Sequence, residues 1–402
     1  MRRKVVSVLH HSLAGRGSKI GEEEGWGWHF RSAKALREHA NHRVVCVRPN
    51  ERGADWFYRT VEDVPLVLTP TSRFSPSVKF WKYSEFSPQM ASYVYRLTSK
   101  HDYIPYIHEY RALNSQLVMR KLIEYQMVLQ HHGSRPPIES SSSPLPLLKS
   151  WSNLRKKKLL RRAKGVIFVL NKAEKSYLED VLGVEAMVKV RTMGADFEEL
   201  KPMSEEGKRR LRREIGVPEE GVVLGTFVGV FGDELGAVKG AHLLARVWKE
   251  LLRRLRGISM IVTGLGASWV KELRTLGVKT YGLLPYEEYL RLLKAWDIYF
   301  LPATSGLYYG GVGVAVMEAM ALGNRVVSPT LIHFPERDKV HRLGALTPFV
   351  NNENELMTFL DNLVYVIENL EAFGPSEIRS LARKYYSWES FAEAFEEALK
   401  RV

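Results

Sequence analysis

Short apolar runs recur along the chain, each followed by a polar or glycine-bearing loop and then by a stretch of helical length. In the N-terminal half, runs of strand length lie at residues 4–9, 44–47, 66–68, 103–107, 127–129 and 166–170. Between the first two, residues 28–38 place Phe30, Ala33 and Leu36 at helical spacing. Strands that alternate with helices predict a doubly wound parallel α/β sheet.

A second alternating series follows residue 200, with strands expected at 222–228, 259–263, 279–281 and 297–301 and helices at 204–215 and 241–255. Between the two series, Gly194 and Pro202 interrupt the pattern. We therefore place a domain junction near residue 200.

Residues 301–327 combine the end of an apolar run, the loop Gly310-Gly311-Val312-Gly313 and a helix of small residues at 314–322. Glycines let backbone N–H groups approach a ligand, and the helix start presents unpaired donors with a partial positive charge. Glu318 lies about one and a half turns into that helix, where a carboxylate can accept hydrogen bonds from ribose or sugar hydroxyls. The order of strand, glycine loop and helix favours a phosphate-binding loop. The alternative is that the glycines are ordinary turn residues and that Glu318 is a solvated carboxylate.

The other strands of the second series also end in glycine, at Gly229, Gly264 and Gly282. Ligands of open α/β sheets bind at the carboxyl ends of the strands. The second domain is therefore expected to hold a phosphorylated ligand.

Composition adds limits on the class of protein. With 402 residues, of which 45% are hydrophobic and 26% charged, the chain has room for two globular cores. The net charge of +14 indicates a polyanionic partner, a membrane surface or a phosphorylated substrate without choosing among them. The single cysteine, Cys46, rules out an internal disulfide and a cysteine-based metal site. One cysteine and four glutamines beside many charged residues point to a thermophilic source.

Targeting signals are not evident in the sequence. No apolar run approaches the roughly 20 residues that cross a bilayer, and residues 1–9 do not read as a secretory leader. We expect a cytoplasmic protein, with peripheral contact with an anionic membrane left open. That contact would come from a segment with Leu147, Leu148, Trp151 and Leu154 on one face and basic residues at 155–164. The alternative is a solvated helix that packs on its own domain.

The motifs, taken in order, resemble the retaining nucleotide-sugar glycosyltransferases of the GT-B fold, specifically family 4 (group 1), over nearly the whole chain. The matching pieces are Ile107-His108-Glu109, His132-Gly133, Gly194-Ala195-Asp196, Lys239-Gly240, Gly264-Leu265-Gly266, Gly282 with Pro285-Tyr286, Glu318 to Gly323, and Ser387-Trp388-Glu389. The resemblance implies two facing Rossmann-like domains: an acceptor-side domain at residues 1–200 and a nucleotide-sugar domain at 201–380. Residues 381–402 would form a helix that returns to the first domain.

The same resemblance implies roles for individual residues. His108 would face the transferred sugar, Lys239 would neutralise the diphosphate, and Glu318 would hold the ribose hydroxyls; these are the candidate catalytic residues. The remaining candidates would contact the donor through the backbone or line its site: Gly25, Gly229, Gly264, Gly282, Leu283, Gly311, Val312, Gly313 and Val314. No cofactor and no metal are expected, and a UDP or GDP sugar would be the donor.

Two positions depart from the family pattern. Gly310 stands where the family has a first glutamate that holds donor-sugar hydroxyls, and Val230 stands where it usually has an arginine after the strand-ending Gly229. Tyr308 and Tyr309 are the nearest polar side chains to the first gap.

Three functions remain to be separated. The first is a metal-independent retaining glycosyltransferase acting on an acceptor hydroxyl, for which an anionic, lipid-linked or polysaccharide acceptor is expected. The second is a catalytically degenerate relative that binds nucleotide sugars or regulates. The third, an enzyme that glycosylates nucleic acid, has only the net charge and Trp26, Trp28, Trp56 and Trp81 in its favour. A dinucleotide-dependent oxidoreductase is disfavoured, because no strand leads into a full G-x-G-x-x-G helix start.

Overall fold

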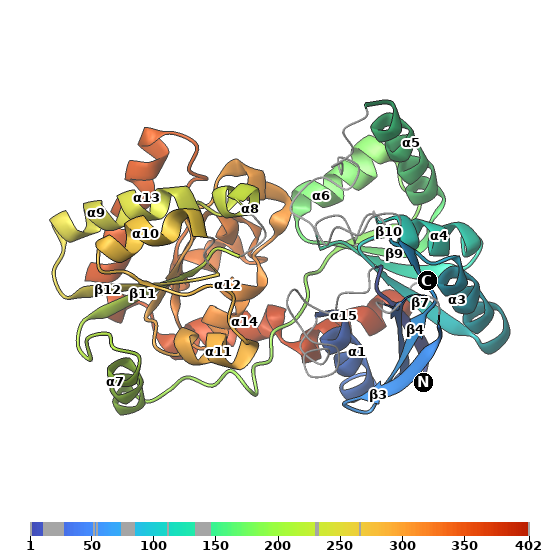
Figure 1. The fold of residues 1–402 in the computed structure, drawn as a ribbon, viewed down its shortest axis with the longest axis horizontal. Helices are drawn as coiled ribbons and strands as arrows, with labels where there is room; N and C mark the ends of the chain where they lie inside the picture. Colours follow the sequence, from blue (N-terminus) through green and yellow to red (C-terminus); the bar gives the residue numbers. More distant parts are fainter. Residues whose placement is uncertain are drawn as a thin grey trace. The chain divides into compact units, whose positions relative to one another are not determined.

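A computed structural model describes residues 2–10, 28–50, 53, 55–73, 85–110, 112–132, 146–229, 233–264 and 267–400. The chain divides into two compact units (Figure 1): unit 1 comprises Met1–Met193 and Trp388–Val402, and unit 2 comprises Gly194–Ser387. Each unit is built on a sheet of mainly parallel strands with helices on its faces. The predicted α/β class with two parallel-sheet domains is confirmed.

Within the described residues, the main sheet of unit 1 has the strand order β10-β9-β8-β7-β1-β2-β4-β3. Its strands are β1 (Lys4–Val8), β2 (Arg43–Pro49), β3 (Phe57–Val61), β4 (Val64–Thr69), β7 (Tyr103–His108), β8 (Gln126–Gln130), β9 (Lys164–Val169) and β10 (Met187–Val190). All neighbours are parallel except β3 and β4. A separate small pair joins β5 (Ser72–Arg73) to β6 (Glu85–Phe86).

Helices cover both faces of that sheet. They are α1 (Trp28–Glu38), α3 (Pro88–His101), α4 (Leu113–Lys121), α5 (Pro146–Arg162), α6 (Lys172–Ser176), the π-helical turn η3 (Tyr177–Leu182) and α15 (Trp388–Lys400). Val6 packs in one apolar cluster with Val94 of α3. Its neighbour Val5 packs in another with Phe30 of α1 and Phe395 of α15. Because adjacent strand residues point to opposite faces and both faces are covered, β1 is buried from Val5 to Val8.

The antiparallel strand β3 was not predicted, and its sequence explains why. It lies at the sheet edge and is largely exposed, so the alternation of buried and exposed positions is weak. Its tight turn to β4 places Glu62 and Asp63 at φ of 42° and 61°. Such a turn usually carries Asn or Gly, and Glu gives no comparable signal.

Unit 2 has one described sheet of order β13-β12-β11-β14-β15-β16, parallel throughout. Its strands are β11 (Val222–Phe227), β12 (Ile258–Thr263), β13 (Lys279–Thr280), β14 (Ile298–Phe300), β15 (Arg325–Val327) and β16 (Gly344–Ala345). The helices are α7 (Glu205–Glu214), α8 (Asp233–Val238), η4 (Ala241–Leu243), α9 (Leu244–Arg254), α10 (Ala267–Thr275), α11 (Tyr286–Leu293), η5 (Ser305–Gly310), α12 (Val314–Ala321), η6 (Pro329–His333), η7 (Arg337–Arg342), α13 (Glu353–Glu368), η8 (Leu370–Ala372) and α14 (Pro375–Tyr386).

The unit boundaries lie a few residues from the expected ones. The junction is at Met193–Gly194 rather than near residue 200, and the returning helix starts at Trp388 rather than at 381. The Ala195 N–H donates to the Tyr386 carbonyl at 2.7 Å, and Phe197 and Leu200 pack in the core of unit 2. These contacts tie residues 194–200 and α14 to the second sheet.

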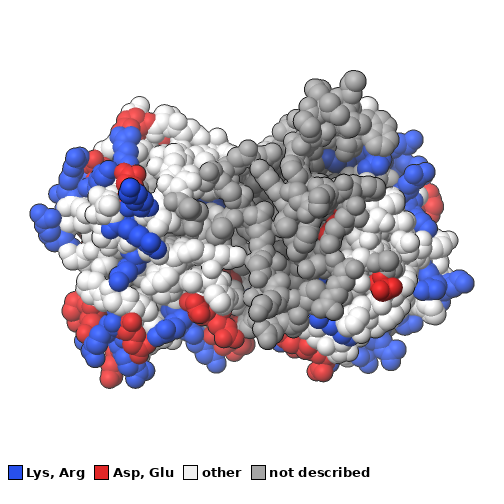
Figure 2. Space-filling view, in the orientation of Figure 1, with Lys and Arg blue, Asp and Glu red and all other residues white. Residues whose placement is uncertain are grey.

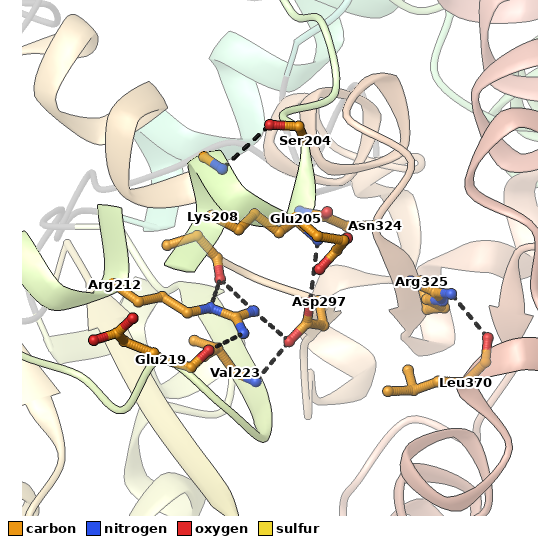
Figure 3. Close-up of polar contacts among 12 residues, drawn as sticks. Ser204, Glu205, Lys208, Arg212, Glu219, Val223, Asp297, Asn324, Arg325 and Leu370 are labelled. Carbon is orange, nitrogen blue, oxygen red and sulfur yellow. Dashed lines mark hydrogen bonds and ion pairs between the residues drawn. The ribbon is translucent and has the colours of Figure 1, made fainter. Parts of the chain in front are cut away.

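A buried ion-pair network fastens α7 to the amino edge of the second sheet (Figure 3). Arg212 donates through Nη2 to Asp297 Oδ2 at 2.6 Å and through Nε to the Ala295 carbonyl at 3.1 Å. Asp297 also accepts from the Val223 N–H at 2.8 Å and from Lys208 Nζ at 3.1 Å. Because the Arg212 guanidinium is satisfied by the protein itself, this edge is structural.

The surface gives no single charged face in the view shown. Basic side chains are spread over both units, and in unit 2 acidic side chains lie among them (Figure 2). Within the described ranges, no helix is both long enough and apolar enough to cross a bilayer.

Candidate functional site

Three predicted glycines of unit 2 meet at the carboxyl edge of its sheet. Gly229 follows β11, Gly264 follows β12, and Gly282 follows β13. The Gly264 N–H donates to the Gly282 carbonyl at 3.0 Å. Gly264 has φ of +69°, and a Cβ on it would lie 2.9 Å from the Gly229 nitrogen and 2.8 Å from the Phe227 ring. Glycine is therefore required at 264 by both conformation and close packing.

Gly282 differs from Gly264, because folding does not require glycine there. Its φ lies outside the left-handed region, and no atom of the described residues lies within 4 Å of the position that a Cβ would take. The next side chain, Leu283, is 50% exposed. The edge of the sheet is thus open at this point, where a side chain would fill space that a ligand can use.

The glycine loop between β14 and α12 leaves helix donors uncapped. Gly311 and Gly313 have φ of 64° and 90°, and Gly313 occupies the N-cap of α12 without a side-chain cap. Val312 is buried, and its carbonyl accepts from Thr330 Oγ1 at 3.1 Å, which fixes the loop. Val314, the first helical residue, is 42% exposed. The first-turn N–H groups of such a helix can bind an anion.

Lys239 lies between α8 and η4 with its Nζ 4.7 Å from the centroid of the Phe227 ring. The following Gly240 has φ of +80° and packs so tightly on the Pro302 carbonyl that a Cβ would overlap it. The Lys239 side chain is half-buried, and this burial lowers its pKa to about 8. No described residue forms an ion pair or hydrogen bond with its ammonium. A cation with no carboxylate among its described neighbours is suited to an anionic ligand.

Glu318 is 3% exposed, and its Oε1 accepts a hydrogen bond from the Tyr286 hydroxyl at 2.7 Å. Burial, followed by the negative charge of Glu318, raises the pKa of Tyr289 well above its usual range. Burial likewise raises the pKa of Tyr299, with Glu318 adding to the effect. The carboxylate is thus held at a fixed place among tyrosines of α11 and β14.

Unit 1 carries histidines at the corresponding edge of its sheet. His108, the last residue of β7, is fully buried. Its Nε2 lies 3.0 Å from Ser7 Oγ and its Nδ1 lies 3.1 Å from His132 Nε2. The His108 and His132 rings stack with centroids 5.3 Å apart, and His29 approaches edge-on at 5.4 Å. Both nitrogens of His108 are therefore used inside unit 1, and His132 is the partly exposed member of the pair.

Burial keeps this cluster uncharged. It lowers the pKa of His29 and of His132 to about 3, and it lowers the pKa of His108 well below the ordinary value. Neighbouring histidines add to the lowering, while Glu109 partly opposes it at His132. At neutral pH these imidazoles are neutral and exchange hydrogen bonds rather than charge.

A second buried pair closes the same edge. His131 Nδ1 contacts a carboxylate oxygen of Glu174, and both side chains are fully buried. Glu174 also accepts from the Tyr110 hydroxyl at 3.2 Å and from the Leu170 N–H at 3.0 Å. The sequence showed His131-His132 at a strand end, but only the fold pairs them with His108 and Glu174.

Several sequence-based predictions fall outside the described residues. They concern Gly25, Val230 and the side chains of Trp28 and Trp151. Within the described residues, no group of three or more His, Cys, Asp and Glu side chains is arranged to hold a metal ion.

The basic segment at 155–164 is largely engaged with its own unit. Arg155 donates to Gln116 Oε1 at 2.8 Å, and Arg161 donates to the Leu182 carbonyl at 2.6 Å. Lys164 pairs with Glu124 at 2.8 Å. These contacts support the packed-helix alternative for those side chains, although Leu154 is 66% exposed. Membrane contact stays a prediction.

The family model that matches this chain covers part of unit 2. Residues 224–369 match the family model described as Glycosyl transferases group 1. The matched range contains Gly229, Lys239, the glycine loop and Glu318. A D-inositol 3-phosphate glycosyltransferase of Corynebacterium jeikeium is 30% identical over 155 residues, which are 35% of each chain. A GDP-mannose-dependent monoacylated phosphatidylinositol monomannoside mannosyltransferase of Corynebacterium glutamicum is 26% identical over 151 residues, 36% of this chain and 38% of that one.

The resemblance to group 1 glycosyltransferases is confirmed. These matches span about a third of the length of the curated relatives.

Solved structures extend the likeness in fold to the whole chain. A sucrose-phosphate synthase of Thermosynechococcus elongatus superposes with a TM-score of 0.70 at 14% identity, covering 100% of this chain and 99% of that one. HepE of Anabaena, solved with UDP, gives 0.68 at 17% identity, covering 99% and 100%. The fold is therefore the GT-B fold of these glycosyltransferases.

Proposed function

We propose that the chain is a metal-independent, retaining glycosyltransferase that moves a sugar from a nucleoside diphosphate sugar to an acceptor hydroxyl. The observation that carries the proposal is Lys239, a cation with no described ion-pair or hydrogen-bond partner, at an edge that also holds three converging glycine turns and the uncapped start of α12. All of these groups belong to unit 2, so they form a donor site within one domain.

The chemistry follows from charge. When the bond between the anomeric carbon and the diphosphate oxygen breaks, negative charge gathers on the leaving diphosphate. Lys239 and fixed backbone donors stabilise that charge without reorganisation. The acceptor oxygen then bonds to the anomeric carbon on the face that the diphosphate leaves, and the acceptor proton passes to the leaving phosphate. This path retains the anomeric configuration and needs no nucleophile from the protein.

Glu318 supplies the site for the nucleoside. Its buried carboxylate is an acceptor that suits the paired hydroxyls of a ribose, and Tyr286 fixes its orientation. HepE was solved with UDP-glucose, and the Corynebacterium glutamicum relative is named for GDP-mannose. UDP and GDP sugars are accordingly the first donors to test. A lipid-linked or polysaccharide hydroxyl is the acceptor that we propose.

The family resemblance implies that a histidine of unit 1 faces the transferred sugar. Because His108 is fully buried with both nitrogens engaged, we assign contact with the sugar to His132 and the positioning of His132 to His108. His108→Ala is expected to abolish transfer and to leave nucleoside diphosphate binding intact, because the lost contact lies outside unit 2.

A second candidate is a degenerate nucleotide-sugar binder, and Gly310 is the observation that favours it. This residue ends η5 at the place where the family carries a sugar-holding glutamate. Gly310→Glu separates the two: a binder gains donor hydrolysis or transfer, whereas an enzyme with another sugar contact loses activity.

The proposed function is tested by a thermal-shift screen with UDP, GDP and ADP and their sugars, followed by an assay for released nucleoside diphosphate. A ligand of the native state raises the melting temperature. We expect stabilisation by one nucleoside diphosphate and its sugar, and release that depends on an added acceptor. A folded protein that binds none of these compounds would exclude the function.

A further inference from the structure

His333 belongs to the same edge of unit 2 but to no predicted role. It ends η6, the turn after β15, and its ring centroid lies 5.7 Å from that of Tyr308 with the planes at 66°. Tyr308 lies in η5, two residues before Gly310, and its ring also contacts Tyr309 and Phe349. The bond from Thr330 to the Val312 carbonyl holds η6 against the glycine loop.

The imidazole of His333 carries a polar atom that the protein leaves unsatisfied. Nε2 is buried, and among the described residues no group exchanges a hydrogen bond with it. A buried polar atom without a partner is costly, and native structures retain few of them. Burial lowers the pKa of His333 to about 4, although a bond with the Tyr308 backbone opposes this. The ring is therefore neutral near pH 7, and its free nitrogen is suited to a neutral partner.

The chemistry of the surroundings selects the partner. A phosphate is anionic and accepts hydrogen bonds, and Lys239 and the start of α12 provide for it. A neutral imidazole has no charge to pair with a phosphate, whereas it exchanges a hydrogen bond with a hydroxyl whichever nitrogen carries its proton. With glycine at 310, the loop beside His333 presents no carboxylate for a sugar hydroxyl.

We infer that His333 is a specificity-determining contact, which binds a hydroxyl of the transferred sugar through Nε2. The inference rests on the proposed function, because it assumes a nucleoside diphosphate sugar at this edge. His333, which follows the neighbouring strand β15, would bind the sugar hydroxyl that a carboxylate at position 310 would otherwise bind. Tyr308 would hold the His333 ring in place.

His333→Phe is the direct test, because it keeps an aromatic ring against Tyr308 and removes both nitrogens. Binding is measured by calorimetry on the full chain with UDP and UDP-glucose, GDP and GDP-mannose, and ADP and ADP-glucose. We expect affinity for the nucleoside diphosphate to stay within about twofold, and affinity for its sugar to fall roughly 3- to 10-fold, the scale of one hydrogen bond. The ligand-free melting temperature should not fall, because the variant buries no unpaired nitrogen.

Two further variants separate contact from structure. His333→Asn restores a polar group and should recover part of the sugar affinity. His341→Phe changes an exposed histidine of η7 and should bind every ligand as the wild type does.

Each outcome decides the inference. Equal loss of affinity for nucleotide and nucleotide sugar in His333→Phe, or no loss at all, would overturn it. The inference would also be overturned if the wild type bound a nucleoside diphosphate and its sugar with equal affinity. That result would leave the donor-nucleotide site in place. A wild type that binds none of the six compounds would remove the proposed function and this inference with it.

Discussion

The two units present the same architectural edge with opposite chemistry. In unit 2, glycines end the strands. The edge leaves backbone donors uncapped, and Lys239 has no ion-pair or hydrogen-bond partner among the described residues. In unit 1, histidines end the strands, and their nitrogens bond with Ser7 and with one another. In both units, the carboxyl ends of the parallel strands lie at this edge. The fold thus supplies the location of a site, and we propose that the residues after each strand set which ligand groups it binds.

The largest expected effect concerns the histidine edge and pH. The pKa values of His29 and His132 are lowered to about 3 in the folded protein, against 6.5 ordinarily, and that of His108 is also lowered. As pH falls below 6.5 the unfolded chain therefore binds protons that the folded chain does not, so stability is full above that value and is lost towards pH 3. Between about pH 6.5 and pH 5, His29 and His132 should each lower the free energy of unfolding by about 2 kcal/mol.

Urea unfolding across this range measures the loss. In His29→Phe the slope of unfolding free energy against pH should become shallower. Stability that does not change with pH in this window would mean that the cluster is not buried and neutral.

Next in size is the pair that closes the same edge. Glu174→Ala should lower the free energy of unfolding by roughly 3 to 5 kcal/mol. It leaves His131, the Tyr110 hydroxyl and the Leu170 N–H buried without the carboxylate that each contacts. Glu179→Ala is the matched control on the following turn, where an exposed pair with Lys175 contributes less than about 1 kcal/mol. Comparable losses in both variants would contradict the closed edge.

The glycines of unit 2 should differ from one another. Gly264→Ala forces a Cβ against Phe227 and Gly229 at positive φ, and should cost roughly 1 to 3 kcal/mol of unfolding free energy. Gly282→Ala meets open space and should change stability by less than about 0.5 kcal/mol. Chemical denaturation compares the two, and destabilisation by Gly282→Ala would show that this part of the edge is packed.

Smaller effects are expected around Glu318. Glu318→Ala should weaken nucleoside diphosphate binding by roughly 1 to 3 kcal/mol, since it removes the acceptor of the ribose hydroxyls. Tyr286→Phe keeps that carboxylate and should cost only about 0.5 to 1.5 kcal/mol of stability, with nucleotide affinity preserved. If Tyr286→Phe lost as much affinity as Glu318→Ala, the tyrosine and not the glutamate would be the contact.

The alternating strands and helices were predictable because they rest on local patterns. Buried strands such as β9 contain continuous apolar runs, and the bounds expected for α1 agree with Trp28–Glu38. The glycine edge was also predictable, since Gly264 and Gly313 occupy conformations that other residues rarely adopt.

What the sequence did not predict depends on distant contacts. The pairing of His108 with Ser7 and His132 joins residues 101 and 24 positions away. The burial that removes charge from these rings comes from three strands and α1 together, so no local signal distinguishes His108 from His132. His333 was missed for the same reason, because only the packing of η6 on η5 leaves its Nε2 without a partner.

The central claim is that the glycine edge of unit 2 binds the diphosphate while the histidine edge of unit 1 does not. Calorimetric titration of UDP, GDP and ADP into the wild type, Lys239→Ala and His132→Ala tests it directly. We expect Lys239→Ala to weaken nucleoside diphosphate binding by roughly 1.5 to 3 kcal/mol, the scale of a hydrogen bond to a charged group, and His132→Ala to leave that binding unchanged. Equal affinity in the wild type and Lys239→Ala, or an equal loss in both variants, would contradict it.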